Sequence, residues 1–240
     1  MGPFGRAFID FFFPPQCPIC GIALGKNPSE RPCPSCFSQM KVFSHPRCPL
    51  CGLGFHTPMG EDHLCSACLT EHWHFTKARS IGPYEGWMVE VISRFKFRGV
   101  ARLAKPLGTL LAEYRDPEFP FSEFDLLLSV PLHPQRLRER GFNQSLLLAR
   151  RIAQIHSLPI DATALQRIRH TQPQTELSGP ERRKNIRQAF AVKRAAIISG
   201  KRILLIDDVF TTGATVQECA KTLLNAGAKQ VDVLTLARVL

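Results

Sequence analysis

Several features of other protein classes are missing from this 240-residue sequence. No apolar run approaches the roughly 20 residues that a membrane-spanning helix needs, so we predict no transmembrane segment. Residues 4–13 have an apolar face, but they contain Arg6 and Asp10 and lead into Pro14-Pro15 without a small-residue cleavage site. We therefore expect no secretory signal peptide. Residues 1–16 are predicted to form a short helix that packs on the body of the protein, with peripheral membrane contact as the alternative.

Acidic residues are scarce in one part of the chain. The formal net charge is +11, and residues 132–202 contain 15 Lys and Arg but only 4 Asp and Glu. The whole basic excess therefore lies in that segment. Such a field favours a polyanionic partner, namely pyrophosphate, nucleic acid or both. A solvated basic surface that serves solubility is the alternative interpretation.

The C-terminal third contains an apolar run, a pair of acids, a short Thr/Gly loop and an amphipathic segment. The continuous apolar residues 203–206 predict a strand that is buried on both faces of a parallel sheet. Asp207 and Asp208 follow it directly. From Ala214 the apolar residues recur with the period of a helix, and Gly227 is well placed to end that helix.

This order of elements places a loop at a helix N-terminus, beside the carboxyl end of a strand. Open α/β sheets bind ligands at that position, and the backbone N–H groups and the helix dipole favour an anion. Asp207 and Asp208 can accept hydrogen bonds from a ribose diol or hold Mg²⁺ through water. A P-loop is excluded because its lysine is missing, and a purely structural strand with a capped helix is the alternative. The residues expected to bind the phosphate are Thr211, Thr212, Gly213, Ala214 and Thr215.

Cysteines are concentrated near the N-terminus, where eight of the nine form four Cys-x-x-Cys pairs. Each pair supplies half of a tetrahedral zinc site. The pairs also repeat, because Cys17-Pro-Ile-Cys-Gly is followed 31 residues later by Cys48-Pro-Leu-Cys-Gly. We predict two successive zinc ribbons; cross-braced pairing and disulfides are the alternatives. The expected ligands are Cys17, Cys20, Cys33 and Cys36 in the first ribbon, and Cys48, Cys51, Cys65 and Cys68 in the second.

The middle of the chain alternates between strand-like and helix-like segments. Residues 124–130 predict the first strand of the main sheet, and the turn after it carries arginines whose planar guanidinium groups suit phosphate. Residues 167–191 are polar and contain Pro and Gly, which predicts a long loop that covers a ligand site, or else an ordinary exposed loop. The residues expected to contact nucleic acid are Arg136, Arg138, Arg140, Arg182, Arg183, Lys184 and Arg187.

The segment from Ile203 to Thr215 resembles the 5-phosphoribosyl-1-pyrophosphate (PRPP) signature of type I phosphoribosyltransferases, with Phe210 as a bulkier departure. Cysteine ribbons, Lys96-Phe-Arg-Gly99, the segment from Val130 to Ser145 and this signature occur here in one order, which is similar to that of the ComF family. The resemblance implies an α/β fold with a type I phosphoribosyltransferase-like parallel sheet flanked by helices, and an N-terminal zinc-ribbon domain. The expected divisions are a short helix (1–16), a double zinc ribbon (17–76) and a phosphoribosyltransferase-like domain (77–240) with a hood at about 77–120 and a flexible loop at about 167–191.

The resemblance also implies roles for single residues. Asp207 and Asp208 would face the ribose as catalytic residues, the following loop would bind the 5′-phosphate, and Arg136 would contact the pyrophosphate. Mg²⁺ would accompany PRPP, while two zinc ions would stabilise the ribbons.

Three functions are compatible with these features. The preferred one is a cytoplasmic DNA-uptake factor of natural competence that binds single-stranded DNA and PRPP, with a helicase and an inner-membrane channel as partners and a peripheral location at that membrane. The second is an active Mg²⁺-dependent phosphoribosyltransferase with an unknown acceptor. The third is a zinc-ribbon adaptor with a degenerate PRPP site.

Overall fold

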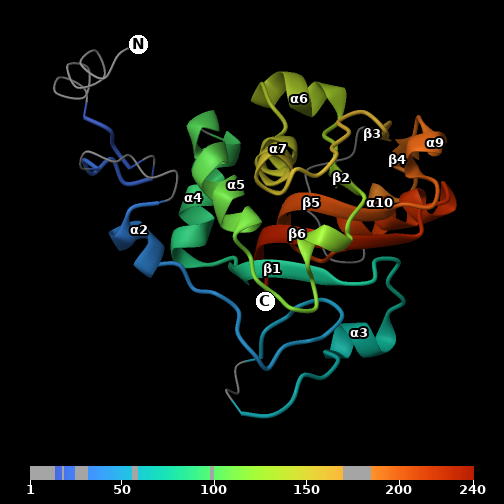
Figure 1. Ribbon diagram of the computed structural model, residues 1–240, viewed down its shortest axis with the longest axis horizontal. Coiled ribbons are helices and arrows are strands. Elements are labelled where there is room, and N and C mark those ends of the chain that lie inside the picture. Colours follow the sequence, from blue (N-terminus) through green and yellow to red (C-terminus); the bar gives the residue numbers. More distant parts are fainter. Residues whose placement is uncertain (1–13, 18, 25–31, 56–58, 98–99, 170–184) are drawn as a thin grey trace.

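The centre of the molecule is a four-stranded sheet in which every pair of neighbours is parallel (Figure 1). The computed structural model describes residues 14–17, 19–24, 32–55, 59–97, 100–169 and 185–240. Most of the predicted N-terminal helix therefore lies outside the described residues. The strand order is β1 (Ala78–Pro83), β6 (Gln230–Arg238), β5 (Arg202–Phe210) and β2 (Leu126–Ser129). This confirms the parallel sheet that the apolar runs predict.

The strand β1 occupies a position that the sequence did not indicate. The sequence assigns these residues to the hood at about 77–120; in the structure β1 pairs with β6 along its length and forms one edge of the main sheet. All six of its residues are buried. Its buried hydroxyl Ser80 Oγ lies 2.7 Å from Thr235 Oγ1 of β6.

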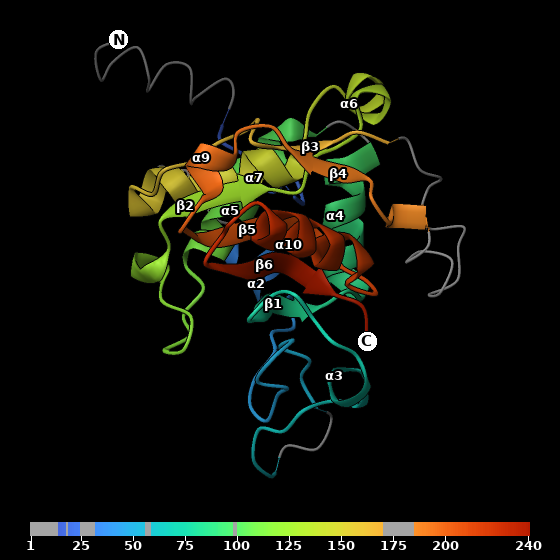
Figure 2. The same ribbon diagram turned by 90° about the vertical axis from the view of Figure 1, so that its right-hand side faces the viewer.

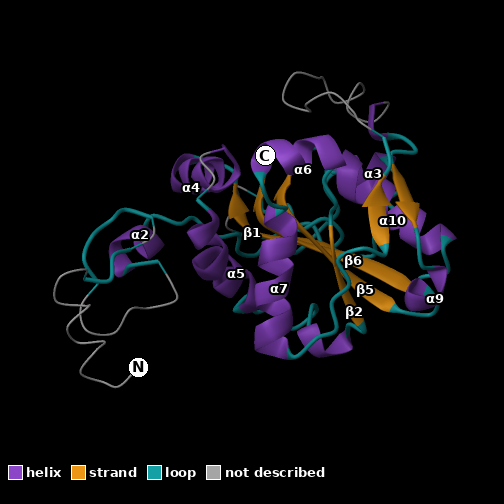
Figure 3. Cartoon of the chain, turned by 90° about the horizontal axis from the view of Figure 1, so that it is seen from above, coloured by secondary structure: helices purple, strands orange, loops and turns teal. Residues whose placement is uncertain are grey.

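Helices cover both faces of the sheet because the apolar strands bury both of their faces (Figure 3). On one face α4 (Gly86–Phe97), α5 (Ala104–Ala112) and α7 (Gln144–His156) pack against Leu204 and Ile206. On the other face α10 (Ala214–Asn225) packs against Ile203 and Leu205. A small antiparallel pair, β3 (Leu165–Arg167) and β4 (Phe190–Val192), joins this second face. Shorter elements of the described C-terminal part are η1 (Ala101–Leu103), η2 (Phe121–Glu123), α6 (Pro134–Arg140) and α9 (Ala195–Ile198). None of the helices in the described ranges is long and apolar enough to cross a bilayer.

The N-terminal cysteine segment repeats one local structure twice. In each copy a glycine amide donates to a cysteine carbonyl at 2.9 Å: Gly21 to Cys17, and Gly52 to Cys48. A short helix then follows the third cysteine of each copy, α2 (Pro34–Ser38) in the first and α3 (Ser66–Thr70) in the second. Figure 2 shows that the second copy lies directly beside β1. The sequence repeat is therefore also a structural repeat.

Candidate functional site

The acidic pair lies at the carboxyl end of β5, which continues through both carboxylates as far as Phe210. Asp207 and Asp208 are 8% and 3% exposed. Asp207 Oδ1 accepts hydrogen bonds from Ser145 Oγ of α7 at 2.8 Å and from the Asp208 amide at 2.9 Å. The Lys96 ammonium of α4 lies 2.9 Å from Asp208 Oδ2 and neutralises it. Residues from three separate elements therefore meet at this pair.

Two carboxylates so close together cannot both ionise easily in a buried site. Burial, followed by the charge of Asp208, raises the pKa of Asp207 to about 7, against the opposing effects of Lys96 and Ser145. Asp207 therefore gains and loses its proton near neutral pH. Perturbed carboxyls of this kind are characteristic of functional sites.

The turn after β5 has the shape that an anion requires. Gly213 is the N-cap of α10 and adopts a left-handed conformation with φ of 76°, which disfavours any residue with a side chain. Because α10 starts directly after it, the first amides of the helix lie at the positive end of its dipole. Thr211, Thr212 and Thr215 are partly exposed around this turn. The structure thus brings the predicted phosphate loop beside the acidic pair.

Arginines gather near the acids, although not on the predicted loop. Residues 134–140 form the helix α6, which Gly141 ends in a left-handed conformation, so the expected arginine-bearing turn is helical instead. Burial lowers the pKa of Arg140, while Asp208 and Asp207 oppose that effect and Arg136 reinforces it. The pKa of Arg167 is also lowered by burial, with Asp207 opposing and Arg136 reinforcing the effect. These three arginines therefore share one electrostatic environment with the acids.

The other predicted nucleic-acid contacts are less clustered. Arg138 and Arg187 are exposed. Arg182, Arg183 and Lys184 lie outside the described residues, as does most of the predicted flexible loop.

Two members of the site were not singled out from the sequence as functional. Lys96 and Ser145 contact the acids from α4 and α7. Both belong to short segments that carry the family resemblance, Lys96-Phe-Arg-Gly99 and Gly141-Phe-Asn-Gln-Ser145. The family resemblance of those two segments was the only indication of a role. The sequence around Lys96 and Ser145 did not show that either side chain would contact the acidic pair.

The eight N-terminal cysteines form two groups of four, with sulfur atoms within 4.8 Å of one another in each group. The groups are Cys17, Cys20, Cys33, Cys36 and Cys48, Cys51, Cys65, Cys68. All are free thiols, and contacts of 3.6 to 3.9 Å between sulfurs exclude disulfides. A tetrahedral ion with Zn–S bonds of about 2.3 Å would separate its sulfurs by about 3.8 Å. The residues therefore fit two structural zinc ions in successive ribbons, which rules out the cross-braced alternative.

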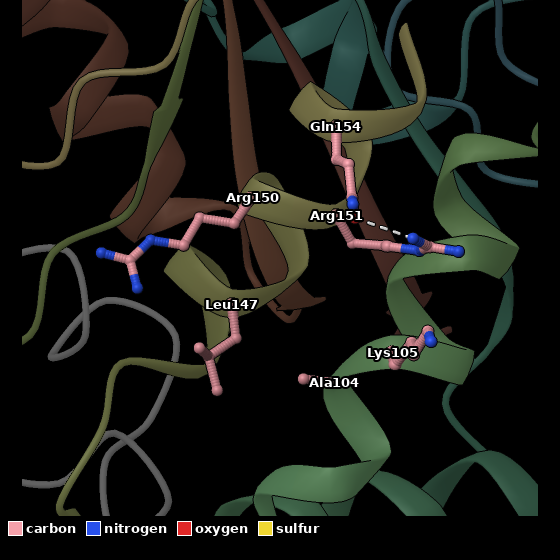
Figure 4. A pocket seen from close by; sticks show the side chains of 6 residues that line it. All are labelled: Ala104, Lys105, Leu147, Arg150, Arg151 and Gln154. Atoms are coloured by element: carbon pink, nitrogen blue, oxygen red, sulfur yellow. Dashed lines mark hydrogen bonds between the residues drawn. The ribbon is translucent and has the colours of Figure 1, made fainter. Parts of the chain in front are cut away.

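A separate hollow of about 240 Å³ lies between α5 and α7 (Figure 4). Lys105, Arg150 and Arg151 contribute positive charge to its lining, and Leu147 and Ala104 contribute apolar surface. Arg151 is engaged there by Thr109 and Gln154 at 3.0 and 2.8 Å. Among the residues that the structure describes, no acidic side chain lines this hollow. Its described lining is therefore basic.

Comparisons with known proteins agree with this architecture. The double zinc ribbon domain family matches residues 8–69, and the phosphoribosyl transferase domain family matches residues 143–240. Competence protein F of Haemophilus influenzae is 31% identical over 95% of this chain and 98% of its own length. Competence protein ComFC of Bacillus subtilis is 32% identical over 88% and 86%. DNA utilization protein YhgH of Escherichia coli K12 is 33% identical over 76% and 82%. The chain is therefore a member of the ComF family, with a double zinc ribbon and a phosphoribosyltransferase-type domain.

Proposed function

We propose that this protein acts in the uptake or use of external DNA, and that it binds PRPP with Mg²⁺ at the acidic pair and single-stranded DNA on its basic surface. The observation that carries the PRPP part is the convergence of Asp207, Asp208 and the Gly213 turn at the carboxyl end of β5. The names of the competence and DNA-utilization relatives support the DNA part.

Each part of PRPP finds a complementary group in this arrangement. The 5′-phosphate suits the Gly213 turn at the N-terminus of α10. The ribose hydroxyls suit the paired carboxylates as donors. Arg136, Arg140 and Arg167 provide guanidinium groups for the pyrophosphate. A bound Mg²⁺ would neutralise part of the phosphate charge, with Asp207 and Asp208 as its ligands through water.

Lys96 forms an ion pair with one of the two carboxylates of the proposed ligand site. The Lys96 ammonium nitrogen lies 2.9 Å from Asp208 Oδ2, and only 19% of the Lys96 side chain is exposed. A ribose hydroxyl or a metal-bound water that approaches Asp208 must share that oxygen with Lys96 or displace it. We expect Lys96 to turn toward the ligand's phosphates, where its charge is again compensated.

Calorimetric titration with PRPP and Mg²⁺ is the direct test. We expect saturable 1:1 binding by the parent protein, and at least a hundredfold loss for the combined Asp207→Asn and Asp208→Asn variant. Asp232→Asn is a matched control, because Asp232 is another buried carboxyl on the neighbouring strand β6. If the parent binds no PRPP, or if the double variant binds as well as the parent, this part of the proposal is wrong.

A second candidate, favoured by the raised pKa of Asp207, is phosphoribosyl transfer. An acceptor would form a bond to the anomeric carbon as the bond to pyrophosphate breaks, and pyrophosphate would leave with the electron pair. A carboxyl with a pKa near 7 is well matched to accept the acceptor's proton at neutral pH. Release of pyrophosphate in the presence of candidate acceptors would test it.

DNA binding would be chiefly electrostatic, because three described aromatic side chains near the basic segment are packed in the core. Phe95 and Phe190 are 0% and 5% exposed, and Phe142 packs on Phe95 with ring centroids 5.6 Å apart, so these aromatics belong to the core. We therefore expect a steep decrease of affinity with salt. This function would place the protein in the cytoplasm near the inner membrane, beside a DNA channel and a helicase.

Charge reversal identifies the surface involved. Arg136→Glu with Arg138→Glu should weaken binding of a fluorescent oligonucleotide by at least tenfold at low salt. Lys105→Glu with Arg150→Glu is the matched comparison, because it introduces the same charge change at the hollow between α5 and α7. If neither pair of changes affects affinity, the DNA part of the proposal is refuted.

A further inference from the structure

The Gly213 turn is packed against a tryptophan from a distant segment. A Cβ added to Gly213 would lie 2.8 Å from Trp73 Cζ3, 2.9 Å from Trp73 Cη2 and 2.6 Å from Phe210 Cζ. The six-membered part of the Trp73 indole therefore lies directly on the backbone of the turn. Phe210 and Phe75 complete this aromatic group, with centroids 6.2 and 5.0 Å from that of Trp73.

The backbone on both sides of Trp73 is fastened to the first turn of α10. The His74 amide donates to Gln217 Oε1 at 2.7 Å, and Gln217 Nε2 donates to the His72 carbonyl at 2.9 Å. The Gln217 amide in turn donates to the Gly213 carbonyl at 2.9 Å. One side chain thus joins the tryptophan segment to the helix turn that would face the phosphate.

Trp73 also belongs to the surroundings of the second zinc ribbon. It packs against the group formed by the four cysteines of that ribbon as well as against the core beneath α10. A second connection runs through the buried Arg238, which donates to the Cys51 carbonyl at 2.9 Å. The guanidinium carbon of Arg238 lies 4.3 Å from the ring centroid of Phe210. Two separate side chains, Trp73 and Arg238, therefore connect the second ribbon with the residues beside the Gly213 turn.

The first ribbon is placed differently. Its cysteines pack with the cluster on the α4 and α5 face, and Arg94 of α4 donates to the Ile19 carbonyl. The two zinc sites, although repeats in sequence, thus have different neighbours.

We propose that the second zinc ribbon is a structural part of the ligand site, and that Trp73 is the positioning residue that holds the Gly213 turn in its anion-binding shape. This inference rests on the proposed function, since it concerns the same turn. It assigns the second ribbon, and not the first, a role in ligand affinity. Trp73 acts through the turn and does not itself contact the ligand.

Amide hydrogen exchange of the full chain tests the coupling without any ligand. Trp73→Ala should accelerate exchange in residues 211–217 by about 10- to 100-fold, and Trp73→Phe should restore most of the protection because it keeps an aromatic ring on the turn. Trp87→Ala is the matched control, because Trp87 is the only other tryptophan and is also partly buried. If 211–217 exchange at the parent rate in Trp73→Ala, or accelerate equally in Trp87→Ala, the proposal is overturned.

The zinc sites provide a second comparison. Cys65→Ser in the second ribbon should accelerate exchange in 211–217, whereas Cys33→Ser in the first should leave that segment at the parent rate. Equal effects of the two changes would overturn the proposed asymmetry.

Fluorescence then relates the turn to ligand binding. In Trp87→Phe, where Trp73 is the only indole, PRPP with Mg²⁺ should change the emission with the same Kd as calorimetry, and Trp73→Ala should raise that Kd by about 10- to 100-fold. If calorimetry shows binding but the Trp73 emission does not respond and Trp73→Ala binds normally, the positioning role is wrong. If the parent binds no PRPP at all, the proposed function fails, and the exchange data still decide the coupling.

Discussion

The protonation of Asp207 makes the stability of this protein depend on pH in a specific way. The pKa of Asp207 rises from its ordinary value of 3.8 to about 7 in the folded protein, chiefly because of burial. The folded chain therefore holds this proton more tightly than the unfolded chain. Its contribution to stability is fully present below pH 3.8 and is lost as the pH rises through about 7.

The size of the effect follows from the same values. At about 1.4 kcal/mol per pKa unit, the difference between 3.8 and 7 corresponds to about 4 kcal/mol. Asp207→Asn removes the titrating group but keeps an oxygen that can accept from Ser145 and from the Asp208 amide. We expect the variant to be close to the parent in stability near pH 4.5, and more stable than the parent by about 3 to 4 kcal/mol at pH 8.

Urea denaturation at several pH values between 4.5 and 8, without added Mg²⁺ and with zinc kept saturating, measures this difference. Effects of pH on zinc binding are common to both proteins and cancel in the comparison. Asp161→Asn is the control, because the pKa of Asp161 is shifted in the opposite direction. Burial raises that pKa, but hydrogen bonds that include those from the Thr163 and Ala164 amides outweigh burial and lower it. The loss of stability in Asp161→Asn should be constant over this range and shrink only in acid. A difference between Asp207→Asn and the parent that does not change with pH would refute the reasoning.

Three further predictions follow from the contacts. Gly213→Ala should reduce PRPP affinity at least tenfold in calorimetry, because φ of 76° and the 2.6 Å approach to Phe210 leave no room for a methyl group; unchanged affinity would contradict this role. Asp116→Ala should lower the free energy of unfolding by about 3 to 5 kcal/mol, because it leaves the buried Arg79 and Arg47 without their shared carboxylate, whereas Glu118→Ala should cost under about 1 kcal/mol. Metal analysis of the purified protein should give two zinc ions per chain, and removing them with a chelator should unfold both ribbons in circular dichroism; a single zinc would mean that one group of four cysteines is not a metal site.

Local patterns were sufficient for much of the fold and for part of the site. The apolar run at 203–206, the change of period at Ala214 and the spacing of the cysteine pairs each have a direct physical cause, and the structure has the strand, the helix and the two ribbon groups there. The arginine-bearing segment was misread as a turn, although Pro134 near its start and Gly141 after its end are ordinary helix boundaries.

The remaining features depend on contacts between distant parts of the chain. Nothing near Lys96 shows that it reaches Asp208, and nothing in residues 78–83 indicates which sheet edge they join. Nothing near Trp73 in the sequence shows that its indole packs on Gly213. Tertiary packing settles such choices, and sequence periodicity carries no information about them.

The order of the strands has a consequence for how this protein is made. The last strand along the chain, β6, lies between β1 and β5, so that Ser80 pairs with a residue 155 positions later. The first ribbon, by contrast, closes over a sequence separation of only 19 positions, from Cys17 to Cys36. Zinc binding can therefore fold the ribbons while the chain is still being synthesised, whereas the complete sheet cannot form before β6 has been made. Pulse-labelled hydrogen exchange should show the ribbons protected before β1, and the Gly213 turn, which contacts both Phe210 of the sheet and Trp73, should become protected last.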